Sequence, residues 1–406
     1  MLALKSSSPV VFNSILEMAN NSYSDFDFIN TTRPSPQFTY VRHLNVSAMF
    51  PLEFAVPMFG YLMPILFILT VVTNTLVVIV LSKKHMHNPT NTILKAMALA
   101  DMFTVLFPAP WLFYFYTLGH YVQPLSPATI CYVFIYMHEV IPALFHTASI
   151  WLTLALALQR HIAICHPTAS LAWCSLPGVV KGIYLIYGLA TLHQSTRFFD
   201  RIYTTVDIWW DDGMITVCGE STASWVSVIS ENVYYNVYFW FRVIFVHVVP
   251  CTALVVLNWL LYRAMRDAKK RKAKLKQKLK QKLKQKEKEC KDPRESNCTT
   301  LMLIAVVTLF LCVETPLAVI TLLHIIASSF RVPVLDYYIA NMLILCTNFC
   351  IIATHPINFA IYCGMSEKFR STFKGLFFKT NLSPRGVSNS QYSTINDGAR
   401  TCTSGF

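Results

Sequence analysis

Long apolar runs constrain this chain more than any other feature of its sequence. Crossing a hydrocarbon core of roughly 30 Å takes about 20 helical residues, and seven runs reach that length. The composition agrees, because 54% of the residues are hydrophobic and only 14% are charged, which does not suit a water-soluble surface. The runs are Met58 to Leu81, Thr92 to Tyr116, Pro127 to Arg160, Leu176 to Arg197, Tyr234 to Tyr262, Thr299 to Ser328 and Leu335 to Gly364.

The runs should be helices. In lipid, backbone polar groups must be satisfied within a helix or a closed barrel, and these runs lack the alternation of barrel strands. We therefore expect an all-α membrane protein, a seven-transmembrane helix bundle over residues 58–364. Residues 365–380 carry four apolar side chains at helical spacing, which predicts a short amphipathic eighth helix on the membrane surface. Prolines inside the runs predict kinks at Pro142, Pro250, Pro316 and Pro356.

Charge predicts which way the bundle sits. The loop over residues 263–298 is strongly basic, with 16 Lys or Arg against 4 Asp or Glu between Arg263 and Arg294. By the positive-inside rule this loop is cytoplasmic, where anionic membrane lipids, rather than nucleic acid, would attract it. We expect a plasma-membrane protein with an extracellular tail over residues 1–57 and a disordered cytoplasmic tail over 381–406. Three glycosylation sequons fall in the extracellular tail, at Asn20, Asn30 and Asn45.

Cysteine placement is consistent with this topology. Of the 12 cysteines, only Cys131 and Cys218 fall on the outer side, where disulfides persist. Their pairing would hold the second outer loop over the bundle.

Several motifs follow one another along the spans. Asn74 lies in the first span and Asp101 in the second, and Gln159-Arg160-His161 closes the third. The fifth contains Pro250. The sixth reads from Phe310 to Pro316, and the seventh contains Asn358 and Tyr362. In this order the motifs resemble those of rhodopsin-like (class A) G-protein-coupled receptors. The resemblance assigns the activation switch and G-protein contact to Gln159, Arg160, His161, Phe310, Pro316, Asn358 and Tyr362.

A closer resemblance involves residues 151–160, 192–201, 297–304, 356–365 and 396–402. These stretches are similar to insect receptors for myoinhibitory peptides (allatostatin B) and sex peptide. The resemblance implies an extracellular amidated neuropeptide as ligand and an inhibitory Gi/o heterotrimeric G protein that lowers cyclic AMP. A receptor kinase and arrestin would act on the tail. The alternative is another amidated peptide, of the FMRFamide-like or myosuppressin type.

Three positions depart from the general family pattern. Gln159 replaces the acid before Arg160, so the usual local ion pair cannot form. Glu314 replaces a tryptophan, and Phe359 replaces the helix-seven proline. We expect the switch to have a similar layout with different chemistry.

Ionisable residues inside the bilayer cost about 2.5–3.5 kcal/mol on insertion scales, so they usually face the bundle interior. One polar set, in mid-bundle, fits either a sodium ion or a water-filled network: Asn74, Asp101, Ser149 and Asn358. A second set, nearer the outer side, forms the candidate peptide contacts: Glu139, His146, Arg197, Trp209, Asp211, Arg242, Glu314 and Asn341. A structural ion pair between Glu139 and Arg242 is an equally good interpretation of those two residues.

Other functional classes have less support. The sequence contains no His-Glu-x-x-His, Gly-x-Ser-x-Gly or nucleotide-binding loop, and its histidines are scattered. It therefore predicts no enzyme, no cofactor beyond the possible sodium ion and no further metal site. A transporter or channel would show internal repeats and matching broken helices, and neither is found.

Overall fold

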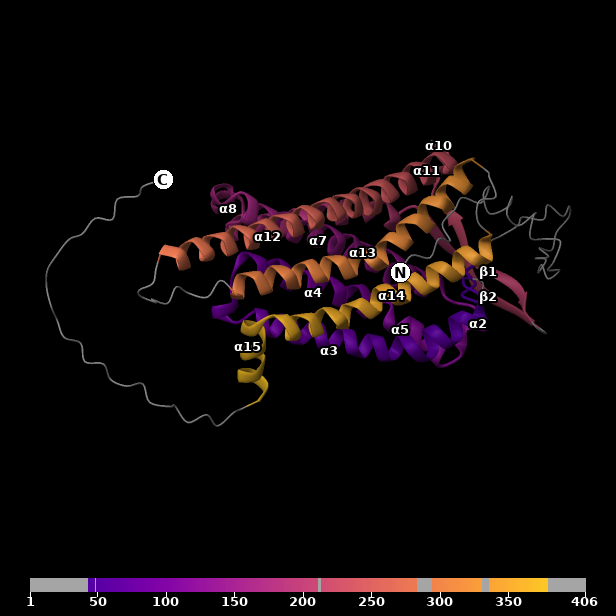
Figure 1. The fold of residues 1–406 in the computed structure, drawn as a ribbon. Coiled ribbons are helices and arrows are strands. Elements are labelled where there is room, and N and C mark those ends of the chain that lie inside the picture. Colours follow the sequence, from indigo (N-terminus) through magenta and orange to yellow (C-terminus); the bar gives the residue numbers. More distant parts are fainter. Residues whose placement is uncertain (1–42, 48, 211–212, 283–293, 331–335, 379–406) are drawn as a thin grey trace.

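The computed structural model describes residues 43–378, apart from residues 48, 211–212, 283–293 and 331–335. Long helices lie side by side along one axis (Figure 1). Within the described part of the chain, six stretches are long and apolar enough to cross a membrane: Leu52–Leu81, Pro89–Thr117, Ala128–Cys165, Glu231–Asp267, Leu301–Ala327 and Tyr338–Met365. Helix α9 (Leu176–Ser195) supplies the remaining span and packs against the second and third. The predicted seven-helix bundle is confirmed, although its first helix begins at Leu52 rather than at Met58.

The spans are built as follows. The first contains α2 (Leu52–Ala55), η1 (Val56–Leu62) and α3 (Met63–Leu81), and the second contains α4 (Pro89–Leu106), α5 (Ala109–Leu112) and η3 (Phe113–Thr117). The third contains α6 (Ala128–Ile135), η5 (Tyr136–Val140) and α7 (Ile141–Cys165). The fifth contains α11 (Glu231–Arg242), η7 (Val243–Val248) and α12 (Val249–Lys282), the sixth is α13 (Arg294–Phe330), and the seventh is α14 (Tyr337–Met365). Shorter elements are η2 (Lys84–Met86), η4 (His120–Val122), α8 (Pro167–Trp173), η6 (Thr196–Phe198) and α10 (Ser224–Ile229).

Prolines shape the helices locally. The π-helical stretches η1, η5 and η7 each end two residues before a proline, at Pro64, Pro142 and Pro250. Proline has no N–H to donate and its ring clashes with the carbonyl four residues earlier, so the preceding turn widens. Pro316 and Pro356 lie instead inside α13 and α14. The predicted disturbance at Pro142 and Pro250 therefore takes the form of π-helical winding.

The predicted eighth helix is α15 (Glu367–Phe377), which turns away from α14 at one end of the bundle (Figure 1). The Ser366 hydroxyl caps it by accepting a hydrogen bond from the Phe369 amide at 3.2 Å. The rings of Phe369 and Phe373 lie 6.0 and 5.7 Å from the ring of Phe359 on α14. Phe359, which stands where the family has a proline, thus packs against α15.

One element of the structure is not helical and was not predicted. Strands β1 (Arg201–Trp210) and β2 (Gly213–Thr222) form an antiparallel hairpin between the fourth and fifth spans, at the end of the bundle opposite α15 (Figure 1). β-Branched residues such as Thr204, Thr205 and Val206 favour a strand here. The hairpin lies outside the membrane-spanning helices. Its backbone groups can therefore form hydrogen bonds with water, so it need not be a helix or a closed barrel.

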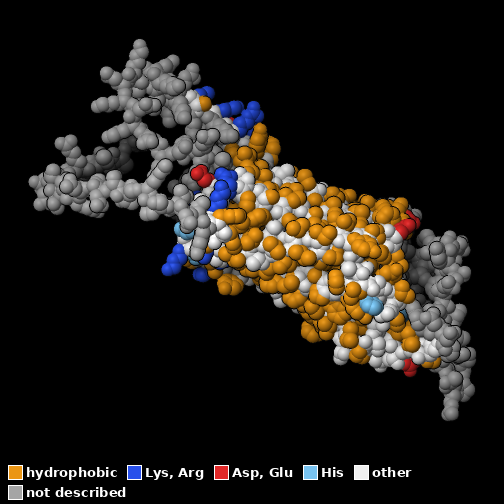
Figure 2. Space-filling model, turned by 90° about the horizontal axis from the view of Figure 1, so that it is seen from below, with side chains coloured by type: hydrophobic (Ala, Val, Ile, Leu, Met, Phe, Trp, Pro, Cys, Tyr) orange, Lys and Arg blue, Asp and Glu red, His pale blue; other side chains and the backbone are white. Residues whose placement is uncertain are grey.

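The surface shows the membrane pattern directly. Hydrophobic side chains cover the length of the bundle, and Lys and Arg side chains gather at one end (Figure 2). This is the α15 end, towards which α12 and α13 project (Figure 1). We call the opposite end, with the hairpin, the lid end.

Candidate functional site

The lid end is closed by a structure that we call the lid, consisting of strands β1 and β2 and of residues 43–47 and 49–50. Cys131 of α6 is disulfide-bonded to Cys218 of β2, with their Cα atoms 6.6 Å apart, as the sequence predicts. The Cys218 amide donates to the Leu125 carbonyl at 3.1 Å, and its carbonyl accepts from the Leu44 amide at 3.0 Å. His43 also pairs with Gly219. The hairpin is therefore fixed to the third span, to the loop between the second and third spans, and to the N-terminal segment.

The N-terminal part of the lid is packed rather than free. Leu44, Val46, Met49 and Phe50 are all buried in the same hydrophobic cluster as Cys131 and Cys218. The C-terminal part of the predicted tail over residues 1–57 thus packs on the bundle through these apolar side chains. Asn45 lies between two of them and accepts hydrogen bonds from Ser47, while Asn20 and Asn30 lie outside the described residues.

Beneath the lid is a cluster of charged side chains centred on Arg197. Its guanidinium pairs with Asp200 and lies 3.8 Å from Oε2 of Glu139, and it also stands over the Tyr238 ring, 5.5 Å from the centroid. Glu139 is therefore paired with Arg197, which corrects the alternative of a Glu139–Arg242 ion pair. Arg242 is buried, and no carboxylate in the described part of the chain forms an ion pair with it.

A second ion pair ties the base of the hairpin together. Arg201 Nη1 on β1 lies 2.6 Å from Glu220 Oε1 on β2, and both side chains are largely buried. Burial alone would lower the pKa of Arg201, but the Glu220 carboxylate outweighs it and holds that pKa well above its usual value. Arg201 thus stays charged and the pair holds the two strands together.

Deeper in the bundle, Glu314 of α13 is completely buried between two histidines from other helices. Its Oε1 lies 3.2 Å from His146 Nε2 on α7, and its Oε2 lies 3.7 Å from His247 Nδ1 on η7. A carboxylate at this depth needs partners, because an isolated buried charge is very costly. The third, fifth and sixth spans therefore meet at one ionisable cluster.

A second polar cluster lies towards the α15 end. The Ser149 hydroxyl donates to Asp101 Oδ1 at 2.6 Å, and His355 Nδ1 lies 3.3 Å from Asp101 Oδ2. A cavity of about 20 Å³ joins this cluster to Glu314, with Asn358 also in its wall. That volume holds about one water molecule. Asn74 does not line the cavity, and its side-chain amide donates to the Thr70 carbonyl in its own helix at 3.0 Å.

The predicted sodium set is only partly assembled. Asp101, Ser149 and Asn358 come together, but Asn74 does not, and both Asp101 oxygens already have a partner. His355 therefore competes with a cation for the carboxylate. These side chains suit a hydrogen-bonded network with water better than a sodium ion, because sodium needs several oxygen ligands that have no other partner.

The predicted switch residues at the α15 end each make different contacts. Gln159 is buried and its Oε1 accepts from the Thr90 hydroxyl at 3.3 Å, so it ties the third span to the second. Arg160 is next to it, with its Nε buried and without a hydrogen-bond partner among the described residues. Tyr362 of α14 is buried and its ring lies 5.9 Å from that of Phe369.

The other predicted residues are placed as follows. His161 Nδ1 lies 3.7 Å from Cys165 Sγ, Phe310 lines the small cavity, and Asn341 is buried in α14. Trp209 is on β1 opposite Met214, whereas Asp211 and the tail over 381–406 lie outside the described residues.

Two histidines were missed by the sequence prediction. His247 and His355 complete the clusters around Glu314 and Asp101. Both are ionisable residues within apolar runs, which is itself a signal of function in a membrane helix. Of the three histidines in these two clusters, only His146 had been identified from the sequence.

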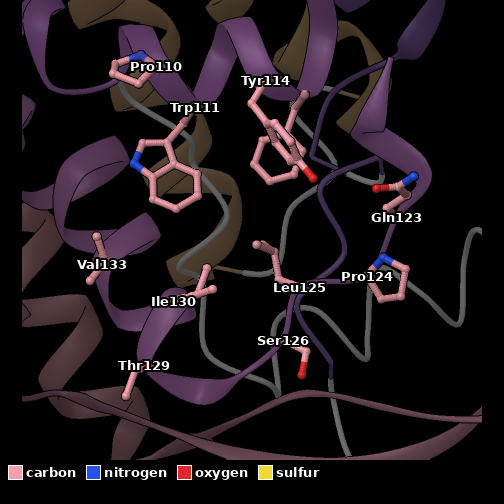
Figure 3. A pocket seen from close by; sticks show the side chains of 11 residues that line it. Pro110, Trp111, Tyr114, Gln123, Pro124, Leu125, Ser126, Thr129, Ile130 and Val133 are labelled. Atoms are coloured by element: carbon pink, nitrogen blue, oxygen red, sulfur yellow. The ribbon is translucent and has the colours of Figure 1, made fainter. Parts of the chain in front are cut away.

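A larger cavity, of about 490 Å³, lies at the lid end between the second span and α6. Trp111 and Tyr114 face Leu125 and Ile130 across it (Figure 3). It contains none of the predicted ligand contacts and is separate from the Glu314 cluster.

Comparison with known proteins agrees with this architecture. Residues 73–354 match the family described as 7 transmembrane receptor (rhodopsin family). The chain is 47% identical to the sex peptide receptor of Drosophila melanogaster over 364 residues, which cover 89% of this chain and 82% of that one. It is 36% identical to sex peptide receptor-related protein 2 of Caenorhabditis elegans, over 79% of this chain and 71% of that one. The identity to the FMRFamide receptor of Drosophila melanogaster is 26%, over 80% of this chain and 54% of that one. The chain therefore belongs to the rhodopsin family of G-protein-coupled receptors, is a receptor rather than an enzyme, and is similar to the sex peptide receptor.

Proposed function

We propose that this receptor is activated by an amidated neuropeptide of the myoinhibitory or sex peptide type and signals through Gi/o to lower cyclic AMP. The observation that carries the proposal is the 47% identity to a receptor named for sex peptide, over 89% of the chain. The FMRFamide receptor, at 26%, supports the alternative ligand class much less.

We place the receptor in the plasma membrane with the lid outside. Disulfides such as Cys131–Cys218 persist in oxidising compartments, and basic segments such as the end of α12 favour the cytosolic side. The same orientation exposes the sequon at Asn45 to glycosylation.

The peptide would enter beneath the lid, past the Arg197 cluster, and reach towards Glu314. A C-terminal amide offers N–H donors and carries no charge, so the buried Glu314 carboxylate is a suitable acceptor. Arg242, which has no carboxylate partner in the described structure, is available for a peptide carbonyl or carboxylate. Trp209 on β1 and Asn341 on α14 would add outer contacts, and Asp211, which lies outside the described residues, is a further candidate.

The signal would pass along the bundle interior. Glu314, the small cavity, Asp101 and His355 form a chain of polar groups that reaches the segment of α14 before Asn358 and Tyr362. Tyr362 packs on α15, and Arg160 lies at the same end of the bundle, where the G protein would bind. The tail over 381–406 would serve a receptor kinase and arrestin, and the part of the basic loop over 263–298 that is nearest the bilayer would contact membrane lipids.

The test is to express the receptor in cells and to measure cyclic AMP and calcium against a panel of amidated peptides. We expect myoinhibitory peptides to lower cyclic AMP, and pertussis toxin to remove that response. A response to FMRFamide-like or myosuppressin peptides alone would refute the ligand assignment. A calcium response that the toxin leaves intact would refute the Gi/o assignment.

A further inference from the structure

The polar side chains inside the bundle are closed off from the outside. Both oxygens of Glu314, both ring nitrogens of His247 and Nε of Arg242 are inaccessible to solvent. Asn341, near the lid end of α14, is also buried. A ligand that contacts these groups must therefore displace part of the protein. The lid closes the outer end of the bundle, so part of the lid has to move.

The hairpin is the fixed part of the lid. A covalent bond joins Cys218 of β2 to Cys131 of α6. The Tyr203 amide on β1 donates to the Tyr132 hydroxyl of α6 at 3.0 Å, and the rings of these two tyrosines are in edge contact, with centroids 5.0 Å apart. Both strands are thus tied to the third span, and the hairpin cannot leave the bundle while the disulfide is intact.

The N-terminal part of the lid, residues 43–47 and 49–50, is attached differently. It contains no cysteine, so no disulfide holds it. The Leu44 amide donates to the Cys218 carbonyl at 3.0 Å, and the ring of Phe50 lies 5.5 Å from the ring of Phe59 on the first span. Contacts of this kind form and break without the cleavage of a covalent bond.

The buried side chains of the N-terminal part pack against the spans near Asn341. Val46 and Met49 are each 3% exposed, and their hydrophobic cluster includes Phe134 of the third span and Ile344 of the seventh. Asn341 is about one helical turn from Ile344. Opening exposes apolar side chains such as Met49 to water, so the closed form predominates and the open form is a minor state.

We infer that the N-terminal part of the lid is a gate, which moves away from the bundle while the hairpin stays in place and so exposes the interior at Asn341. The contacts within the lid carry this inference, whichever peptide activates the receptor. That the agonist peptide enters through the gate rests on the function proposed above.

The first test is hydrogen exchange of the full-length receptor in phosphatidylcholine nanodiscs, followed by mass spectrometry. Met49→Ala weakens the apolar contact that keeps the gate closed, so the Leu44 amide should exchange about tenfold faster. The amides that pair β1 with β2 should be unaffected. Met214→Ala is the matched control, because Met214 lies on β2 and is 57% exposed, and it should change neither set. An unchanged Leu44 amide, or equal acceleration of the β1–β2 amides, would overturn the inference.

A second test asks whether the open gate exposes the interior. Asn341→Cys places a thiol at a buried position of α14, where a water-soluble methanethiosulfonate reagent has to enter the bundle to react. Adding Met49→Ala should speed the modification of residue 341 about tenfold, and adding Met214→Ala should not. Equal rates in the two double variants would show that movement of the N-terminal part does not open the interior.

Peptide entry is tested separately. A fluorescent form of an activating peptide should associate about tenfold faster with Met49→Ala, because the open form is more populated. Unchanged association beside faster modification of residue 341 would refute entry through the gate. If no amidated peptide binds, the proposed function fails, and the exchange and thiol-modification results still decide whether the gate opens.

Discussion

The carboxylate of Glu314 lies 3.2 Å from Nε2 of His146, and this contact joins the sixth span to the third in the middle of the bundle. Most members of the rhodopsin family have a tryptophan at the position of Glu314. The middle of this bundle therefore has an ionisable side chain where other members have an aromatic one. His247 on the fifth span is the second partner. Because Glu314 contacts both histidines, we expect the loss of its charge to lower agonist potency.

Glu314→Gln keeps the size of the side chain and removes its charge. We expect agonist potency to fall by about 2 kcal/mol, or about thirtyfold, because hydrogen bonds to charged groups are worth about 1.5–3 kcal/mol. The measurement is a cyclic AMP dose–response curve with surface expression followed in parallel. Glu367→Gln, at the start of α15, is the control and should leave potency unchanged. Normal potency in Glu314→Gln would remove Glu314 from the peptide site.

Sodium sensitivity tests the second cluster. Because His355 already lies beside Asp101, agonist binding to the native receptor should be insensitive to replacing about 0.15 M choline chloride with sodium chloride. His355→Ala removes this competitor, so sodium should then lower agonist affinity by about fivefold or more. His324→Ala on α13, outside the Asp101 cavity, is the control. A sodium effect on the native receptor would instead support a bound ion.

Basal activity tests the position before Arg160. Gln159→Glu would supply the missing acid beside Arg160, and an ion pair there should hold the inactive state more firmly. We expect basal nucleotide exchange on the G protein to fall about threefold, the effect of a modest ion pair. Gln123→Glu, on the first loop near the lid, should not alter it. A rise in basal exchange would mean that the Gln159–Thr90 contact is the main restraint.

Replacing either cysteine of the disulfide, or both, should lower stability by the same amount. Cys131→Ser, Cys218→Ser and the double variant should each lose about 4 kcal/mol of stability, because the bond closes a loop between residues that are 87 positions apart. Thermal unfolding of the purified receptor measures the loss. The three variants should be indistinguishable, since each breaks the same bond. Additive losses would show that the two side chains act separately.

The N-terminal part of the lid gives a fifth prediction. Leu44→Ala should lower stability by about 2 kcal/mol, because Leu44 is buried under the hairpin. Val228→Ala, at an exposed position of α10, is the control and should have little effect on thermal unfolding. Equal losses in the two variants would mean that burial of Leu44 does not hold the lid in place.

The helical bundle could be predicted because lipid leaves the backbone few choices. Twenty apolar residues such as those before Leu81 or Tyr262 specify a span almost by themselves. The hairpin from Arg201 to Thr222 could not be predicted in the same way, since water satisfies its backbone equally well in a loop. Its course depends on Cys218 and on the contact with Leu44, which are distant in the sequence.

The sequence predicts which acidic residues belong to the candidate site, but it does not predict which side chains they contact. Asp101 and Glu314 are identified by their charge in apolar runs. Their partners, His355 and His247, depend on the rotation of each helix about its axis, and the π-helical turn in η7 sets that rotation for His247. A sequence periodicity of 3.6 residues cannot register such a turn. The ion pair between Glu139 and Arg242, one of two interpretations of those residues, is wrong, because Glu139 lies beside Arg197 instead.

Helix α12 continues unbroken from Val249 to Lys282. About 20 residues separate its last membrane-level aromatic residue, Tyr262, from Lys282, a rise of about 30 Å along a straight helix. Attraction to anionic lipid falls off over a screening length of about 8 Å at physiological ionic strength. Only the first turns beyond Tyr262 are therefore close enough to feel the leaflet. The distal lysines are held at the distance of a docked G protein, so their charge should affect how fast that partner arrives more than how firmly the receptor sits in the bilayer.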